Sequence, residues 1–260
     1  MTPPLTYLEF HAVFVVPPIL LLAWLAVHRS EAWWDRRVGS GLAIVIALAL
    51  VYTTPWDNLL IAEGVWWYGE RATVATIWHA PIEEYLFFVL QPILTALWLA
   101  QFLEVADVSL HIPTRHRVIG ALAGITVSLV GFGLLQTTTT FYLGAILFWA
   151  GPILAIQWAF GLTYLWRVRR LTVLAIAVPT CYLWIADWIA IRLGIWIISP
   201  AHTTGYTLVG LPIEEALFFL VTNVFVVQAL VLYVWVLERR HELPTLEQAA
   251  GWFGRDVDVG

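Results

Sequence analysis

The sequence contains no lysine, so all 13 of its basic residues are arginine. A retinal Schiff base needs a lysine amine, which excludes a rhodopsin-type site. Cys181 is the single cysteine, and one cysteine excludes both a disulfide framework and a cysteine metal cluster. The seven histidines do not occur at zinc-ligand spacing. We therefore expect neither a metal nor a cofactor.

Charged residues are also scarce, at 12% of the chain, whereas 61% of the residues are hydrophobic. Soluble domains are about 25% charged. Several apolar runs exceed about 18 residues, the length of a membrane-spanning helix. The composition predicts an all-α, multi-pass protein of the cell membrane that contacts lipid and has no nucleic-acid partner. The first apolar run is too long and too poorly flanked to be a cleaved signal peptide.

The hydropathy pattern predicts seven membrane-spanning helices, and the arginines orient them. The expected spans are about 6–27, 39–55, 80–103, 117–135, 141–165, 171–192 and 212–236. The loops after the first, third and fifth spans and the segment after the seventh are arginine-rich: Arg29, Arg36, Arg37, Arg115, Arg117, Arg167, Arg169, Arg170, Arg239 and Arg240. Because arginine gathers on the cytoplasmic side, we expect the N-terminus outside and the C-terminus in the cytoplasm.

An internal repeat divides the chain. The matched pairs are Tyr7 and Tyr142, Pro17 and Pro152, Asp57 and Asp187, Gly64 and Gly194, Trp66 and Trp196, Glu83 and Glu214, and Glu84 and Glu215. Each half has three spans, which alone would invert the second half, but the extra span at 117–135 restores its orientation. The predicted architecture is two parallel three-helix repeats joined by a linking helix. We divide it into a first repeat at 1–105, a linking helix at 106–140, a second repeat at 141–237 and a cytoplasmic tail at 238–260.

Each repeat contains one copy of a motif that begins a span. The copies are Pro81-Ile82-Glu83-Glu84-Tyr85-Leu86-Phe87-Phe88 and Pro212-Ile213-Glu214-Glu215-Ala216-Leu217-Phe218-Phe219. Proline and acidic residues suit the first turn of any helix, so a single copy could be only a helix start. Two copies in matching positions of a membrane protein favour a functional role.

Asp57 and Asp187 are expected at the ends of the second and sixth spans, on the same side of the membrane as the glutamates. Ionisable groups in membrane helices mark functional sites by default, although these aspartates could instead only cap loop backbone. Adjacent helical residues point about 100° apart, so one glutamate of each pair faces inward, and the sequence does not select which. A carboxylic acid kept protonated in an apolar pocket can donate a proton, and ring faces stabilise a cation by roughly 0.5–2 kcal/mol.

Other motif-defined classes are absent from the sequence. No Gly-x-Gly-x-x-Gly motif indicates a dinucleotide site. No Asp-x-x-x-Asp motif is present to bind magnesium diphosphate, and no arginine follows the Glu-Glu pairs as it does in one class of intramembrane protease. His79 and His202 lie near the site loops and could assist proton transfer, though each alone is typical of a loop residue.

At these motifs the chain resembles the membrane-integral lycopene beta-cyclases, a family of two-subunit bacterial, fused archaeal and fungal cyclase/phytoene synthase members. The resemblance covers about residues 5–237 and looks like a fusion of two three-span subunits through an extra span. Lysine absence with a net charge of -5 suggests a haloarchaeal source. The motifs that carry the resemblance are Tyr52-Thr53-Thr54-Pro55-Trp56-Asp57-Asn58, Gly64-Val65-Trp66, residues 81–88, Asp187 and residues 212–219.

The resemblance implies a redox-neutral isomerase that converts lycopene through gamma-carotene to beta-carotene. The implied acid and base residues, with their orienting partners, are Glu83, Glu84, Glu214, Glu215, Asp57 and Asp187. The implied substrate-binding residues are Trp56, Asn58, Trp66, Phe87, Phe88, Trp196, Phe218 and Phe219. The second half departs from the first by having Trp184-Ile185-Ala186 in place of Thr54-Pro55-Trp56, so one half could be catalytic while the other shapes the cavity.

Two other functions remain open from the sequence. A carrier could bind a lipophilic ligand between the repeats and use the glutamates for proton coupling. A carotenoid-binding or hydratase-like relative would hold the same ligand or add water to the cation. The aromatic residues around the motifs favour cyclisation, because a carbocation in a dry site loses a proton, whereas a carbocation in a wet site adds water.

Overall fold

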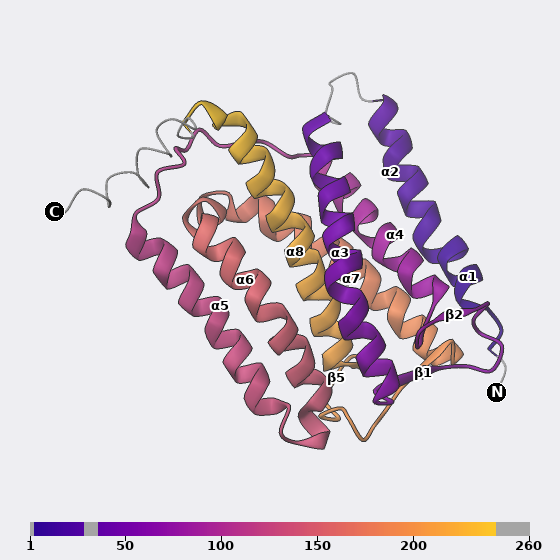
Figure 1. Ribbon diagram of the computed structural model, residues 1–260. Helices are drawn as coiled ribbons and strands as arrows, with labels where there is room; N and C mark the ends of the chain where they lie inside the picture. The colour runs from indigo at the N-terminus through magenta and orange to yellow at the C-terminus, as the bar shows by residue number, and fades with distance from the viewer. Residues whose placement is uncertain (1–2, 29–35, 243–260) are drawn as a thin grey trace.

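The computed structural model describes residues 3–28 and 36–242 (Figure 1). Within these ranges, seven helices are long and apolar enough to cross a membrane, which confirms the predicted helical multi-pass class. The candidate spans are Tyr7–His28, Arg37–Ala62, Ile82–Ala100, Thr114–Leu134, Thr138–Arg167, Arg169–Leu193 and Ile213–Glu238. Arg29 and residues 243–260 of the predicted tail lie outside the described ranges.

The first span is a composite helix. It consists of α1 (Tyr7–Phe10), the π-helical turn η1 (His11–Val15) and α2 (Val16–His28). A capping box starts it, because the Glu9 amide donates to the Thr6 hydroxyl at 3.2 Å and the Thr6 amide donates to the Glu9 carboxylate at 2.8 Å. Single π-turns inside α-helices often occur at functional sites, and this one directly follows Tyr7 and Phe10, which are buried.

The second span is longer than predicted. We expected it to end near residue 55, but α3 (Arg36–Ala62) continues through Pro55. Proline removes one backbone donor, and here the helix continues for seven residues beyond it, to Ala62. The helix ends at Gly64, whose φ of 71° is favourable for glycine. Asp57 consequently lies within the helix and not at its end.

The other long helices are α4 (Ile82–Ala100), α5 (Thr114–Leu134), α6 (Phe141–Arg167), α7 (Arg169–Leu193) and α8 (Ile213–Glu238). Short helices η2 (Thr138–Thr140) and η3 (Arg240–Glu242) precede α6 and follow α8. Figure 1 places α1 and the labelled strands at one end of the bundle, and the end of α8 at the other.

Six short strands form three two-stranded sheets. They are β1 (Trp66–Tyr68), β2 (Thr76–Ile77), β3 (Ala80–Pro81), β4 (Trp196–Ile198), β5 (Thr207–Leu208) and β6 (Leu211–Pro212). β2 pairs with β3 and β5 pairs with β6, each within one half of the chain. β1 pairs antiparallel with β4, with Trp67 opposite Ile197 at the centre. This third sheet joins the loops of the two halves at one end of the bundle.

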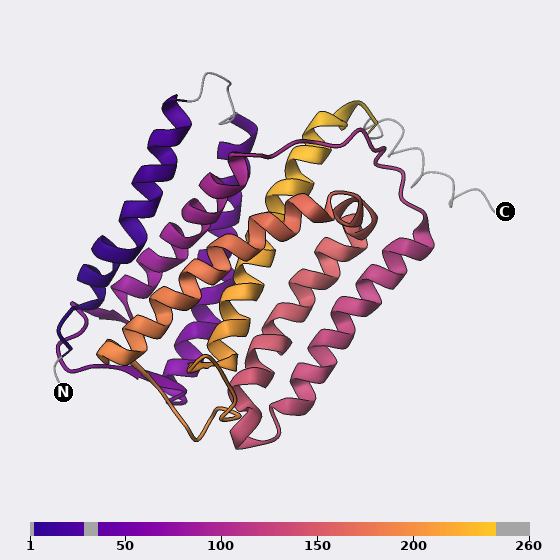
Figure 2. The ribbon, with the colours of Figure 1, turned by 180° about the vertical axis from the view of Figure 1, so that it is seen from behind.

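Helix α5 lies at one edge of the bundle and α2 at the opposite edge (Figures 1 and 2). α5 packs closely against α6 because glycines face its neighbour. A Cβ atom on Gly124 would overlap the Ala155 backbone, and one on Gly131 would overlap that of Phe148. The linking helix therefore packs on the outside of the second half and leaves the centre to the other helices.

Matching contacts tie the two halves together. The Tyr52 hydroxyl on α3 donates to the Trp149 carbonyl on α6 at 2.8 Å. The Tyr182 hydroxyl on α7 donates to the Phe14 carbonyl in the first span at 2.7 Å. Reciprocal contacts of this kind are expected of two parallel repeats, and the division into repeats remains our proposal.

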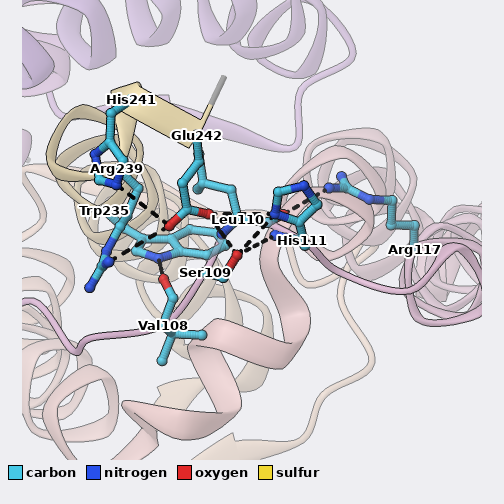
Figure 3. Close-up of polar contacts among 9 residues, drawn as sticks. All are labelled: Val108, Ser109, Leu110, His111, Arg117, Trp235, Arg239, His241 and Glu242. Carbon is cyan, nitrogen blue, oxygen red and sulfur yellow. Dashed lines mark hydrogen bonds and ion pairs between the residues drawn. The ribbon is translucent and has the colours of Figure 1, made fainter. Parts of the chain in front are cut away.

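The extended segment between α4 and α5 is held against the end of α8 (Figure 3). The Glu242 carboxylate accepts hydrogen bonds from the Ser109 hydroxyl at 2.6 Å and from the Leu110 amide at 2.8 Å. The Trp235 indole donates to the Val108 carbonyl at 2.7 Å. These contacts lie at the end of the bundle opposite the strands.

Candidate active site

A cavity lies between the two halves, near the sheet formed by β1 and β4. Its wall is mostly aromatic and apolar, with four carboxyl groups. The lining residues are Tyr7, Phe10, Trp56, Asp57, Trp66, Glu84, Phe87, Tyr142, Leu183, Ala186, Asp187, Trp196, Ile198, Glu215, Phe218 and Phe219. Both halves contribute matched residues, so they enclose one common space.

The four carboxyl groups come from four different helices. Asp57 lies on α3, Glu84 on α4, Asp187 on α7 and Glu215 on α8. Asp57, Asp187 and Glu215 are buried and Glu84 is partly buried. The lining residues include no arginine. An ionised carboxylate in such surroundings is costly unless it is hydrogen-bonded, so the hydrogen-bond partners of each group decide what it can do.

Tyrosine hydroxyls donate to both cavity glutamates. Tyr68 donates to Glu84 at 2.7 Å and Tyr142 donates to Glu215 at 2.8 Å. Tyr7 lines the same cavity as Glu84. Burial, together with the Glu84 carboxylate, raises the pKa of Tyr68 well above its usual range, so this phenol keeps its proton and remains a donor. The Trp66 indole donates to the Tyr68 oxygen at 3.0 Å and fixes its position.

The aspartates are held differently. The Trp196 indole donates to one oxygen of Asp187 at 2.8 Å. Among the described residues, the Oδ2 atoms of Asp57 and Asp187 are buried without a hydrogen-bond partner. A buried polar atom without a partner is unusual in a native protein. These oxygens are therefore available to a substrate or to a transferred proton.

The first glutamate of each pair has a different environment. The Val74 amide donates to Glu83 at 2.9 Å, and the Thr204 amide and hydroxyl donate to Glu214 at 2.7 and 2.8 Å. Neither glutamate lines the cavity. Glu83 and Glu214 were predicted as catalytic candidates, and the structure places them where they hold the loops that precede α4 and α8.

Two predicted substrate-binding residues also lie away from this cavity. The side-chain oxygen of Asn58 accepts hydrogen bonds from the His79 and Ala80 amides at 2.8 and 2.9 Å, so Asn58 fixes a loop. Phe88 lines a neighbouring apolar cavity. The remaining predicted aromatic residues line the carboxyl cavity itself: Trp56, Trp66, Phe87, Trp196, Phe218 and Phe219.

Three tyrosines of the site were not among the residues predicted from the sequence. Tyr7 and Tyr142 are matched positions of the internal repeat, which was the available signal. Tyr68 ends the aromatic segment Gly64-Val65-Trp66-Trp67-Tyr68. His79 and His202, considered for proton transfer, are not lining residues.

The two halves of the site are not equivalent. Glu84 accepts a hydrogen bond from Tyr68 in β1, whereas Glu215 accepts one from Tyr142 on α6. Trp56 lines the cavity in the first half, and Ala186 occupies the matching position in the second. The departure seen in the sequence therefore lies on the cavity wall.

Comparisons with known proteins agree on one family. The family model described as lycopene cyclase matches residues 6–102 and 133–234. The chain is 53% identical over 236 residues to a lycopene beta-cyclase of Halobacterium salinarum, which covers 90% of this chain and 98% of that protein. It is 33% identical over 243 residues to a bifunctional lycopene cyclase/phytoene synthase of Arthroderma gypseum, across 86% of this chain and 40% of that protein. No solved structure matches the chain.

Proposed function

The chain belongs to the lycopene cyclase family, and from that premise we propose that it closes the acyclic ends of lycopene into beta rings, through gamma-carotene to beta-carotene. The observation that carries the proposal is the aromatic cavity into which both halves direct carboxyl groups. Cyclisation is a redox-neutral isomerisation, so an acid, a base and a wall that tolerates a cation are sufficient.

The reaction balances with these groups alone. An acid protonates the C1–C2 double bond of an end group and leaves a cation at C1. The C5–C6 double bond attacks C1, which forms the C1–C6 bond and moves the cation to C5. A base then removes the proton from C6 and the C5–C6 double bond is restored. One proton enters the substrate and one leaves it, so the enzyme regains its starting state once a proton passes from the base back to the acid.

We assign the base to Glu84 and the acid to the Asp187–Glu215 pair. Hydrogen bonds donated to a carboxylate favour its ionised form, and Glu84 accepts one from Tyr68, whose phenol is itself fixed by the Trp66 indole. The pair in the second half receives one from Tyr142 and one from Trp196. Asp57, with a buried oxygen that lacks a partner in the described structure, would return the proton from Glu84.

The aromatic wall would stabilise the cation. The Trp56 and Phe218 rings are nearly parallel, at 8° with centroids 5.8 Å apart. Trp66 lies 5.6 Å from Tyr142 between ring centroids. Ring faces attract a desolvated cation, and an aromatic wall leaves little room for the water that a hydratase would need.

We further propose the membrane orientation indicated by the arginines. The N-terminus and the sheet of β1 and β4 would lie outside, and the end of α8 with Arg239 and Arg240 would face the cytoplasm. The carboxyl cavity would then open within the outer half of the membrane. Reporter fusions after residues 28, 100 and 167 should all report the cytoplasmic side.

The test is expression in a bacterium that accumulates lycopene, with pigments separated by HPLC. The unsubstituted chain should yield beta-carotene. Glu84→Gln and Glu215→Gln should each lower conversion by about 10²- to 10⁴-fold, the usual contribution of general acid–base catalysis. Glu63→Gln, at an exposed glutamate near the end of α3, is the matched control and should convert normally.

Three results would contradict the proposal. Normal conversion by both Glu84→Gln and Glu215→Gln would show that these glutamates take no part in the reaction. Unchanged lycopene with well-folded, unsubstituted protein would favour the proton-coupled carrier, which moves its ligand without altering it. A hydrated product in place of a ring would favour the hydratase-like alternative.

A further inference from the structure

A second, larger cavity adjoins the carboxyl cavity. Residues from α3, α4, α6 and α8 line it, and it shares Phe87 and Phe218 with the first cavity. It extends along α8 as far as Ala229, away from the strands. The two cavities therefore share part of their walls, and the carboxyl groups lie at the end nearer the strands.

The second cavity is apolar although polar residues lie on its wall. The Tyr52 hydroxyl donates to the Trp149 carbonyl at 2.8 Å, and the Thr222 hydroxyl donates to the Phe218 carbonyl at 3.1 Å. The Gln91 amide donates to Asn223 at 2.8 Å. Because these groups bond within the protein, hydrocarbon side chains make up most of the surface that faces the cavity.

A run of stacked rings connects the two spaces. Trp56, on the wall of the carboxyl cavity, stacks on Trp149, on the wall of the apolar one, with centroids 4.7 Å apart. Phe218 belongs to both walls and lies 5.8 Å from Trp56. Such a surface suits a flat conjugated chain that passes from one cavity into the other, since ring faces pack well against π-systems.

The apolar cavity also reaches the surface that would face lipid. Leu48 of α3, on its rim, is 62% exposed. Ile153 of α6 also lines this cavity and is partly exposed. A hydrocarbon ligand dissolved in the membrane could therefore enter between α3 and α6 without crossing a polar layer.

We propose that the apolar cavity binds the conjugated hydrocarbon chain of the substrate while one end group occupies the carboxyl cavity. The inference rests on the proposed function and adds to it a binding site for the part of the molecule that does not react. It also implies that the protein processes one end of the substrate at a time, because the bound hydrocarbon chain directs the far end away from the carboxyl groups.

Filling the apolar cavity tests the inference. Ala49 on α3 and Ala229 on α8 line it. Tryptophan at either position should fill the space proposed for the hydrocarbon chain of the substrate. Ala43→Trp is the matched control, because Ala43 is exposed on α3 and is not a lining residue. The variants are made in a Glu84→Gln background, purified in detergent, and measured for bound lycopene by visible absorption.

We expect Ala49→Trp and Ala229→Trp to weaken lycopene binding by about ten-fold or more, which corresponds to 1.4 kcal/mol, with no change for Ala43→Trp. Ala49→Leu and Ala229→Leu should give intermediate losses, and they provide the result if a tryptophan variant fails to fold. Unchanged binding in folded variants at both positions would overturn the inference.

The same variants without Glu84→Gln separate this inference from the proposed function. If the unsubstituted chain makes no beta-carotene, the proposed function fails. If it makes beta-carotene and the filled variants convert lycopene equally well, the chain-binding inference fails and the proposed function stands.

Discussion

The hydroxyl of Tyr142 donates a 2.8 Å hydrogen bond to Glu215, joining the start of α6 to the start of α8. The backbone fixes the donor as well, because the Tyr142 amide donates to the His202 carbonyl at 3.1 Å. Both side chains are buried. A tyrosine that is fixed through its backbone amide and its hydroxyl controls both the proton and the orientation of the carboxyl group that it contacts.

Removing this hydroxyl should therefore slow the reaction without unfolding the protein. Hydrogen bonds to charged groups contribute about 1.5–3 kcal/mol, so we expect Tyr142→Phe to lower the rate of lycopene conversion by about 10- to 100-fold. Tyr233→Phe is the matched control, since its hydroxyl contacts Ser40, which is remote in the chain from the site. Equal rates for the two variants would show that the bond has no role in turnover.

Glu83 and Glu214 should matter for stability more than for chemistry. Each accepts a hydrogen bond from a backbone amide in the loop before its helix. Glutamine keeps the shape of the side chain, but its amide oxygen is a weaker acceptor than a carboxylate. We expect Glu83→Gln and Glu214→Gln to lower the midpoint of thermal unfolding in detergent, while the folded enzyme keeps its rate within a few-fold. Rate losses as large as those of Glu84→Gln would instead make the first glutamates catalytic.

Glu242 should make the stability of the protein depend on pH. The hydrogen bond from Ser109, followed by that from the Leu110 amide, lowers the pKa of Glu242 below its usual range. A carboxyl group with a lowered folded-state pKa stabilises the protein above its unfolded pKa, about 4.3. That contribution is lost as pH falls through the folded-state value.

The measurement is thermal unfolding of the whole chain and of Glu242→Gln between about pH 6 and about pH 3. The difference in unfolding temperature between the two proteins should shrink as the pH falls. Glu104→Gln, at an exposed position of the same extended segment, should follow the unsubstituted chain throughout. A difference that is constant with pH would contradict the role of ionised Glu242.

The close contact between α5 and α6 should be sensitive to one methyl group. Gly124→Ala would place a Cβ against the Ala155 backbone, and overpacking of this kind costs about 1–3 kcal/mol. Gly133→Ala on the same helix meets nothing within 4 Å, so it should be neutral or slightly stabilising because alanine favours helix. Unfolding midpoints in detergent would compare them, and equal stability would show that the helices separate easily.

Much of the membrane architecture follows from the sequence alone. Runs of apolar residues longer than about 18 define the helices whatever their neighbours, because the backbone in lipid has to bond to itself. The internal repeat matches Asp57 to Asp187 and Glu84 to Glu215 from the sequence alone. The predicted end of the second span was wrong, because the span was expected to end near residue 55 and α3 runs on to Ala62.

Tertiary structure decided which carboxyl groups face the cavity. Glu83 and Glu84 are adjacent and chemically identical in the sequence. Only the packing of the loop gives Glu83 a hydrogen bond from the Val74 amide and Glu84 one from the Tyr68 phenol. The sequence likewise contains Trp56 and Trp149 with nothing to pair them, yet they stack across the two halves. Local sequence sets helix and loop, whereas the direction in which a side chain faces depends on neighbours brought together only when the helices pack.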